Sequence, residues 1–309
     1  MIGAKVIAGV VQVLGGVGLS PLIPGLVQHF KARLQGRPGP SPLQPYRELR
    51  RLWRKSAVSP YPRTPIYELA PPIVAGSLLL ALLLVPVAGR SPGWPVGHDA
   101  LVLVGLFALG RFAITLAAWD TGGGFGLMGA SRDLTLAVSV EAVLLLVLLV
   151  VALPSGSTDL LALSASAARA RVWGEPAHWA AALAFALVIL AETGRQPVDN
   201  PDTHLELTMI HEGPLLEYAG RELAYLHWSA AARHWIMLVL ATELFVPQPA
   251  PFAARLAVLA VSLPVWCVLL ALVETTQAKM RVLRVPMFLG AGGAVCLLGL
   301  ASWFAGGGS

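Results

Sequence analysis

Residues 134–154 read LTLAVSVEAVLLLVLLVVALP, a largely apolar run in which Glu141 is the one charged residue. As an α-helix rising 1.5 Å per residue, a run of this length crosses the ~30 Å of hydrocarbon in a bilayer. The stretch therefore predicts a transmembrane helix. It also puts a carboxyl group in the middle of that helix, where a charge is costly and commonly marks an ion path.

Comparable apolar runs fill most of the chain, at about 1–26, 66–89, 99–118, 176–193, 231–249, 252–274 and 286–304. The 309 residues are 56% hydrophobic and 13% charged, with a mean hydropathy of +0.70. This balance is far from that of a soluble domain. We therefore expect an all-α polytopic membrane protein with about eight transmembrane helices, forming a single membrane domain over residues 1–309.

The segment after the first run, residues 29–63, is strongly basic, with nine lysines and arginines against one acid. Within it, Tyr46, Leu49, Leu52 and Trp53 recur at helical spacing, and arginines stand between them: Arg47, Arg50, Arg51 and Arg54. This pattern predicts an amphipathic helix in the membrane interface, with Trp53 toward lipid and the arginines toward headgroups. A solvated basic loop is the alternative.

The distribution of basic residues predicts the orientation of the chain. One set of alternating loops holds fifteen lysines and arginines and the other set holds four. Since cytoplasmic loops are enriched in these residues, we expect a multi-pass protein of the cytoplasmic membrane with both termini outside. The net charge of +5 therefore reflects membrane topology and does not indicate a nucleic-acid partner.

An acidic segment interrupts the apolar pattern between residues 192 and 228. It holds seven of the seventeen carboxylates: Glu192, Asp199, Asp202, Glu206, Glu212, Glu217 and Glu222. Three of them, Asp202, Glu206 and Glu217, would fall near one stripe of a helix that starts at Asn200. Carboxylates gathered this closely and partly desolvated are expected to have raised pKa values, which suits proton uptake and release near neutral pH. The alternative is a solvated cytoplasmic loop of ordinary acids.

We also consider a continuous polar axis through Glu141, Glu192, Asp199 and Glu206. In the alternative, Glu141 forms a purely structural ion pair with Arg111 of the neighbouring apolar run.

Three sequence features resemble cofactor-binding or metal-binding motifs, but each is incomplete or lies in the wrong structural setting. Residues 124–129, GFGLMG, match G-x-G-x-x-G but follow an apolar helix rather than a strand, so they predict a glycine-rich turn. His211 and Glu212 begin an H-E-x-x-H pattern that Leu215 breaks. Cys267 and Cys296 lie in apolar runs without a CxxC pair. We therefore expect no metal or cofactor on this chain.

The polar segments together carry a resemblance to a known family. The stretches that carry it are AETGRQPVDNP at 191–201, HLELT at 204–208, HE at 211–212 and LEYAGR at 216–221, with PLQPY at 42–46, DTG at 120–122 and AKMR at 278–281. In these stretches the chain resembles the family of subunit 1 of respiratory complex I, the NADH-quinone oxidoreductase, in the branch of formate hydrogenlyase subunit 4.

The resemblance implies a membrane subunit of a group 4 [NiFe]-hydrogenase complex without a redox centre of its own. The implied partners are the large and small subunits of a peripheral [NiFe]-hydrogenase, iron–sulfur subunits and antiporter-like membrane subunits. The [NiFe] and iron–sulfur centres would lie on those partners. Residues carried over as an ion path are Glu141, Glu192, Arg195, Asp199, Glu206, Glu212 and Glu217. The alternatives are a quinone-binding subunit of a complex I-like dehydrogenase and a stand-alone ion transporter.

Overall fold

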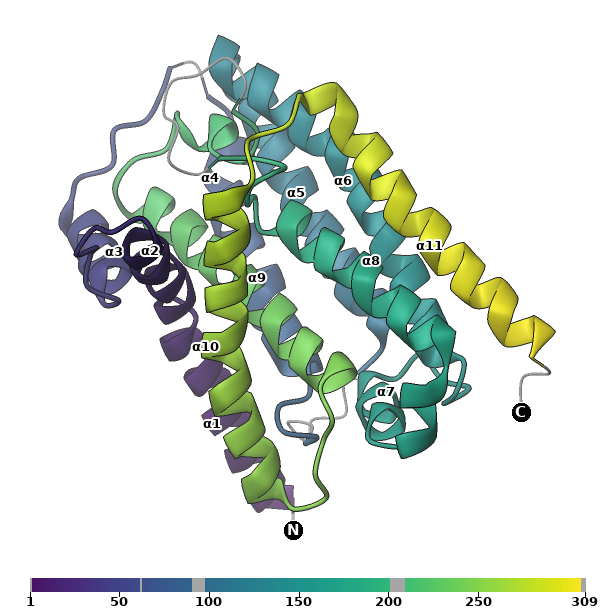
Figure 1. Cartoon of the computed structure of the whole chain (residues 1–309). Helices are drawn as coiled ribbons and strands as arrows, with labels where there is room; N and C mark the ends of the chain where they lie inside the picture. The colour runs from purple at the N-terminus through teal and green to yellow at the C-terminus, as the bar shows by residue number, and fades with distance from the viewer. Residues whose placement is uncertain (1, 62, 91–97, 201–208, 307–309) are drawn as a thin grey trace.

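The computed structural model describes residues 2–61, 63–90, 98–200 and 209–306. In these ranges the chain folds into helices and forms no strand beyond isolated bridges. The long helices run side by side as a bundle (Figure 1): α1 (Ile2–Leu19), α4 (Pro65–Leu84), α5 (Ala100–Thr121), α6 (Gly124–Ala152), α8 (Pro176–Glu192), α9 (Gly220–Phe245), α10 (Phe252–Thr276) and α11 (Val285–Ala305).

The helices confirm the all-α polytopic class. Six helical segments of the described chain are long and apolar enough to cross a membrane, and α8 is a shorter apolar helix of 17 residues. Helix α9 has 26 residues but carries four charged side chains. Each of the eight predicted apolar runs corresponds to one of the eight long helices, although several of the ends differ. The start of α1 and the end of α11 lie at the same end of the bundle (Figure 1).

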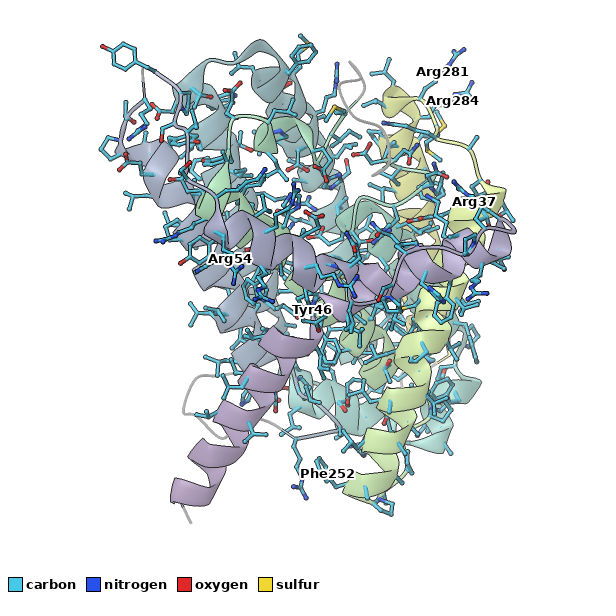
Figure 2. The ribbon with its side chains drawn as sticks, turned by 90° about the vertical axis from the view of Figure 1, so that its left-hand side faces the viewer. Arg37, Tyr46, Arg54, Phe252, Arg281 and Arg284 are labelled. Carbon is cyan, nitrogen blue, oxygen red and sulfur yellow. The ribbon has the colours of Figure 1, made fainter. Side chains whose placement is uncertain are left out.

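The predicted first span was wrong at its C-terminal end. The apolar run continues to Leu26, but α1 ends at Leu19 and a second helix, α2 (Leu22–Leu34), begins after a turn at Ser20 and Pro21. Helix α2 packs on α10 and runs across the bundle (Figure 2). Uniform hydropathy hides such a turn, because both arms of the bend are apolar.

The predicted amphipathic helix is present as α3 (Gln44–Arg54). Leu52 is its buried residue, whereas Arg47, Arg50, Arg51 and Arg54 are exposed. The Trp53 ring meets that of Tyr225 on α9 edge-on, with their centroids 5.2 Å apart. Like α2, helix α3 runs across the bundle rather than along it (Figure 2).

Helix α9 forms the centre of the bundle. It packs against α1, α2, α3, α4, α7 (Leu160–Ala167), α8 and α10. Its stretch from Ile236 to Leu240 is fully buried. A helix enclosed by protein does not need a uniformly apolar surface, which explains how α9 accommodates charged residues. Its start at Gly220 also means that the final part of the predicted acidic loop, 192–228, is helical.

Candidate functional site

The loop between α8 and α9 folds back onto the bundle. The described parts are residues 193–200 and 209–219, including the short 3-10 turn η2 (Gly213–Leu215). Gly194 adopts φ +61°, a left-handed conformation that glycine accepts without strain. The amide of Met280 donates to the Pro197 carbonyl at 2.9 Å, which ties the loop to the segment after α10.

The glycine-rich stretch at 124–129 has a packing role. The prediction of a turn at these residues was wrong, because they form the first turns of α6 and the break between α5 and α6 falls at Gly122 and Gly123. Gly129 lies directly under η2. A Cβ added at Gly129 would come within 2.7 Å of the Gly213 Cα and 2.9 Å of the Pro214 Cδ. Only glycine allows the loop to approach α6 this closely.

Two tyrosines hold the far end of the loop. The rings of Tyr67 on α4 and Tyr218 stack with centroids 4.3 Å apart and 6° between planes. Tyr67 donates its hydroxyl to the Glu217 carbonyl at 2.8 Å, and Tyr218 donates to the Tyr67 carbonyl at 3.0 Å. These contacts fix the loop end to a helix 150 residues earlier in the chain.

Below the loop, one carboxylate binds two arginines. Arg111 on α5 donates from Nη2 to Oε2 of Glu192 at 2.5 Å, and Arg233 on α9 donates from Nη1 to Oε1 at 3.0 Å. All three side chains are nearly inaccessible to solvent. We call Arg111, Glu192 and Arg233 the arginine cluster. Because two cations share one anion, its formal charge is positive.

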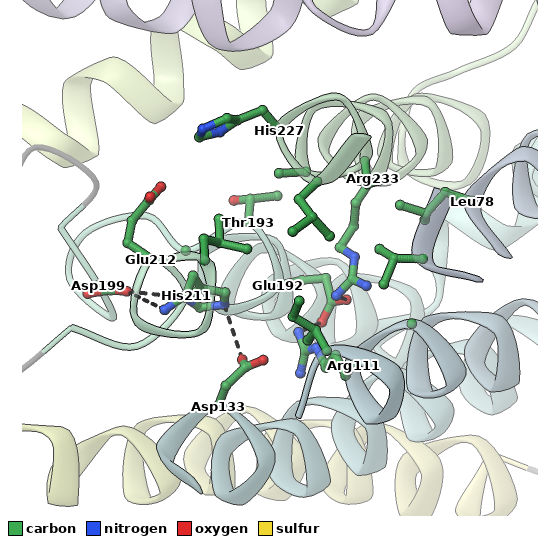
Figure 3. A pocket seen from close by; sticks show the side chains of 18 residues that line it. Leu78, Arg111, Asp133, Glu192, Thr193, Asp199, His211, Glu212, His227 and Arg233 are labelled. Carbon is green, nitrogen blue, oxygen red and sulfur yellow. Dashed lines mark hydrogen bonds and ion pairs between the residues drawn. The ribbon is translucent and has the colours of Figure 1, made fainter. Parts of the chain in front are cut away.

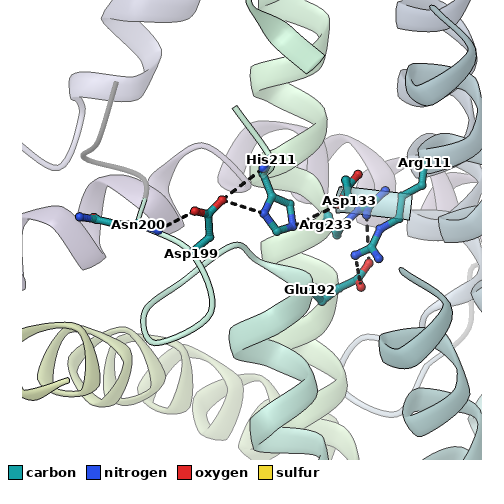
Figure 4. A network of polar contacts seen from close by, with 7 residues as sticks. All are labelled: Arg111, Asp133, Glu192, Asp199, Asn200, His211 and Arg233. Carbon is teal, nitrogen blue, oxygen red and sulfur yellow. Dashed lines mark hydrogen bonds and ion pairs between the residues drawn. The ribbon is translucent and has the colours of Figure 1, made fainter. Parts of the chain in front are cut away.

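A second group, the loop cluster, consists of Asp133, Asp199, His211 and Lys279 (Figure 4 shows its first three members). Lys279 donates to Oδ1 of Asp199 at 2.8 Å, and the His211 backbone amide donates to Oδ2 at 3.2 Å. The His211 ring lies between two carboxylates, with Nδ1 3.2 Å from Oδ2 of Asp199 and Nε2 3.6 Å from Oδ1 of Asp133. The imidazole can therefore exchange protons with either acid after small movements.

This geometry determines how the loop cluster ionises. Burial alone would raise the pKa of the Asp199 carboxyl, but His211 and Lys279 outweigh it and hold that pKa well below its ordinary value. Burial alone would lower the pKa of His211, whereas the hydrogen bond to Asp199 and the negative charges of Asp133 and Asp199 raise it. The pKa of Asp199 is thus lowered rather than raised, because its nearest neighbours are cations. The expectation of raised carboxyl pKa values concerned Asp202, Glu206 and Glu217, and the first two lie outside the described residues.

Arg195 belongs to a third ion-pair group, separate from the loop cluster. Its Nη1 donates to Oε1 of Glu274 on α10 at 2.9 Å, and the Lys31 ammonium on α2 lies 3.2 Å from Oε2 of Glu274. Glu274 is fully shielded from solvent. The three residues join α2, the loop and α10.

Two cavities meet at the loop. The first, of about 160 Å³, is lined by members of the arginine and loop clusters (Figure 3). The second, of about 620 Å³, lies between α2, α3, α9 and the loop. Thr193, Glu212, His227 and Ala230 line both, so Glu212 marks the junction. Several buried polar atoms have no protein partner within the described ranges, among them Nε and Nη1 of Arg111 and Oγ of Ser229, which suits water in the first cavity.

The other predicted site residues are dispersed. Glu141 is half-buried within electrostatic range of the arginine cluster. No described side chain forms an ion pair with it, and Arg111 pairs with Glu192 instead. Glu217 lies beside the turn that precedes α6, close to Gly123. Glu206 lies outside the described residues.

Several residues of the site were not predicted as members. Asp133, His211, Arg233, Lys279 and Lys31 come from five separate segments. The sequence could have indicated Arg233, because it is a charged residue inside an apolar run. It could have indicated His211, because this histidine lies within the acidic segment. The described residues contain no group of three or more His, Cys, Asp or Glu side chains that could hold a metal ion.

The fold and site define a polytopic helical membrane protein with a buried, titratable cluster under a loop at one end. The family model for NADH dehydrogenase matches residues 7–299. The chain is 32% identical to hydrogenase-4 component C of Escherichia coli, with 98% of each chain covered. It is 30% identical to formate hydrogenlyase subunit 4 of the same organism, covering 97% of this chain and 99% of the relative. The chain belongs to the NADH dehydrogenase family, which confirms the resemblance drawn from its sequence.

A solved structure shows the same fold. A chain in the structure of the membrane-bound sulfane sulfur reductase, an archaeal respiratory membrane complex, superposes with a TM-score of 0.82 at 20% identity. The match covers 97% of this chain and 99% of that one.

Proposed function

We propose that this chain is the membrane subunit of a formate hydrogenlyase-like group 4 [NiFe]-hydrogenase complex. Its full-length similarity to hydrogenase-4 component C and formate hydrogenlyase subunit 4 supports this proposal. The names of these relatives, a component and a subunit, favour a role within an assembly over that of a stand-alone ion transporter.

The proposal includes coupling of electron transfer to ion movement through the loop. The observation that carries it is the His211 imidazole between Asp199 and Asp133, beside a cavity that also reaches Glu192. A titratable imidazole between two acids can accept and release a proton near neutral pH. We favour H⁺ over Na⁺, since Asp199 and Glu192 are already bound by cationic side chains.

In this proposal the loop end of the bundle faces the cytoplasm and receives the peripheral subunits. Hydrogenase large and small subunits and iron–sulfur subunits would carry the [NiFe] and iron–sulfur centres, and antiporter-like subunits would adjoin within the membrane. Helix α3 would lie at the membrane surface with Arg47, Arg50, Arg51 and Arg54 against anionic headgroups, because these side chains are exposed on one short amphipathic helix.

A second candidate, a quinone-binding subunit of a complex I-like dehydrogenase, is favoured by one observation. The second cavity, of about 620 Å³, lies within the range of small-molecule sites, roughly 300–1,000 Å³. Its lining combines prolines and leucines of α2 and α3 with Arg195, His227 and His234.

Purification of the tagged chain with its native partners in mild detergent separates the two candidates. The preparation would be analysed for nickel, for its subunits, and for hydrogen evolution and quinone reduction. Nickel-containing subunits with hydrogen evolution are expected. Quinone reduction without nickel would support the second candidate, and a chain that purifies alone and transports ions would overturn both.

A further inference from the structure

A groove opens on the side of the bundle between α1 and α10. The two helices diverge toward the end that holds the first residues of α10, around Phe252 (Figure 2). Between them is a cavity of about 350 Å³ whose back wall is formed by residues of α4 and α9, including Leu82, Trp235 and Ile236. At its edges Val11 and Leu256 are 64% and 47% exposed. The groove therefore opens outward, to the face that meets lipid in a membrane protein of this class.

The interior of the groove suits a hydrocarbon chain. Its lining is apolar except for Gln12 and Arg90, and the Gln12 amide already donates to the Val85 carbonyl at 2.8 Å. Gly15 and Gly16 form part of the wall, and a Cβ added at Gly15 would meet no atom within 4 Å. A flexible apolar chain can fill such a space without leaving a polar group unpaired.

Cationic side chains stand at one end of the groove. The Arg90 guanidinium carbon lies 3.7 Å from the ring centroid of Phe252, and both residues also line an adjoining cavity of about 390 Å³ that includes Arg255. Arg90 is exposed and has no carboxylate partner among the residues that the structure describes. Arg255 donates from Nε to the Pro249 carbonyl at 2.9 Å. The carboxylate of the nearby Glu243 accepts hydrogen bonds from other groups: the Ser164 hydroxyl donates to its Oε2 at 2.6 Å, and the Gly89 amide donates to the same oxygen at 3.2 Å.

We propose that this groove binds an anionic phospholipid, with an acyl chain between α1 and α10 and the phosphate against Arg90 and Arg255. Charge complementarity favours this occupant over a partner's transmembrane helix. A phospholipid has an apolar acyl chain next to an anionic phosphate, and the groove has an apolar lining next to two arginines, so the two match in order and in charge. The site is separate from the loop and from the proposed coupling path.

The test uses the complex purified with this chain, stripped of loosely bound lipid and titrated with phosphatidylglycerol or with neutral phosphatidylcholine. Native mass spectrometry would count the bound lipid. The variant R90Q/R255Q removes the headgroup contacts, and R169Q/R171Q is its control, with the same loss of charge near the same end of the bundle. G15L fills the groove, and G18L is its control, on the same helix but outside the groove lining.

The wild-type complex is expected to retain one more phosphatidylglycerol than R90Q/R255Q and G15L, while both controls match the wild type. Two arginines at an anionic headgroup predict a roughly 30-fold weaker affinity in R90Q/R255Q. Equal retention in all variants would overturn the proposal, as would equal binding of phosphatidylcholine. Crosslinking of a G15C variant to a transmembrane partner would also overturn it, in favour of a helix as occupant.

Discussion

Arg111 and Glu192 form a buried ion pair between α5 and the end of α8, with Nη2 2.5 Å from Oε2 and side chains 4% and 1% exposed. Arg233 takes the other oxygen of the same carboxylate. Glu192 is thus the shared anion of two guanidinium groups beneath the loop, and it lines the cavity that His211 also lines.

Replacing Glu192 by Gln should destabilise the protein strongly, because two buried arginines lose their counter-charge. Breaking a buried pair in this way costs roughly 3–5 kcal/mol. The matched control is Glu68→Gln, which breaks the exposed pair of Glu68 with Arg63 and should cost about 1 kcal/mol or less. Thermal unfolding of the purified proteins measures both, and equal losses would show that Glu192 does not hold the arginines together.

Gly129→Ala should displace the loop, because the new methyl group would overlap the Gly213 backbone and the Pro214 ring. Overpacking of this kind costs roughly 1–3 kcal/mol. Gly124→Ala, on the same helix with no atom within 4 Å of the added group, serves as control. Limited proteolysis of the loop should be faster in Gly129→Ala and unchanged in Gly124→Ala. Unchanged cleavage in both would contradict the close packing of loop and helix.

Tyr67→Phe should weaken the anchor at the loop end while leaving the stacked rings in place. It removes the hydroxyl that donates to the Glu217 carbonyl, a loss of about 1 kcal/mol. Tyr61, which is 97% exposed, provides the control Tyr61→Phe. Thermal unfolding of the two variants should differ, and a Tyr67→Phe protein as stable as Tyr61→Phe would show that this hydrogen bond does not anchor the loop.

The sequence predicted much of the fold because hydropathy and periodicity are local signals. The run around Glu141 is helical within α6, and the alternation of Tyr46, Leu49 and Leu52 with arginines marks α3. The turn at Ser20 was missed because both α1 and α2 are apolar on either side of it. Local patterns identify helices but do not show how they bend against one another.

The partners in the site could not be predicted, since pairing depends on packing between distant segments. Arg111 and Glu192 are 81 residues apart, and Lys279 and Asp199 are 80 apart. Sequence composition singled out Glu192, Arg195 and Asp199 as polar residues of one loop. The structure shows that these residues belong to different groups, since Arg195 binds Glu274 whereas Asp199 binds His211.

Attachment of the loop should depend on pH. The raised pKa of His211 contributes stability that is fully present below its ordinary value of 6.5 and is lost as pH rises through the folded value. The lowered pKa of Asp199 contributes stability that is present above 3.8 and is lost as pH falls through the folded value. The loop should therefore be held most firmly between these limits and loosen on the alkaline side.

Hydrogen-exchange protection factors of residues 209–219 would measure this dependence from about pH 6 to about pH 9, where a histidine with a raised pKa loses its charge. His211→Gln should lower protection and remove its alkaline decline. His227→Gln, at the junction of the two cavities, should behave like the wild type. An unchanged pH profile in His211→Gln would assign the loosening to another group.

The most direct test of the central claim is proton uptake driven by hydrogen evolution, measured in proteoliposomes that hold the whole complex with a trapped pH-sensitive dye. Asp199→Asn removes the carboxylate that Lys279 and His211 share, and Glu68→Gln is again the control at an exposed pair. We predict that Asp199→Asn still evolves hydrogen but moves far fewer protons per hydrogen molecule, while Glu68→Gln matches the wild type. An Asp199→Asn complex with the wild-type proton-to-hydrogen ratio would contradict coupling through this loop.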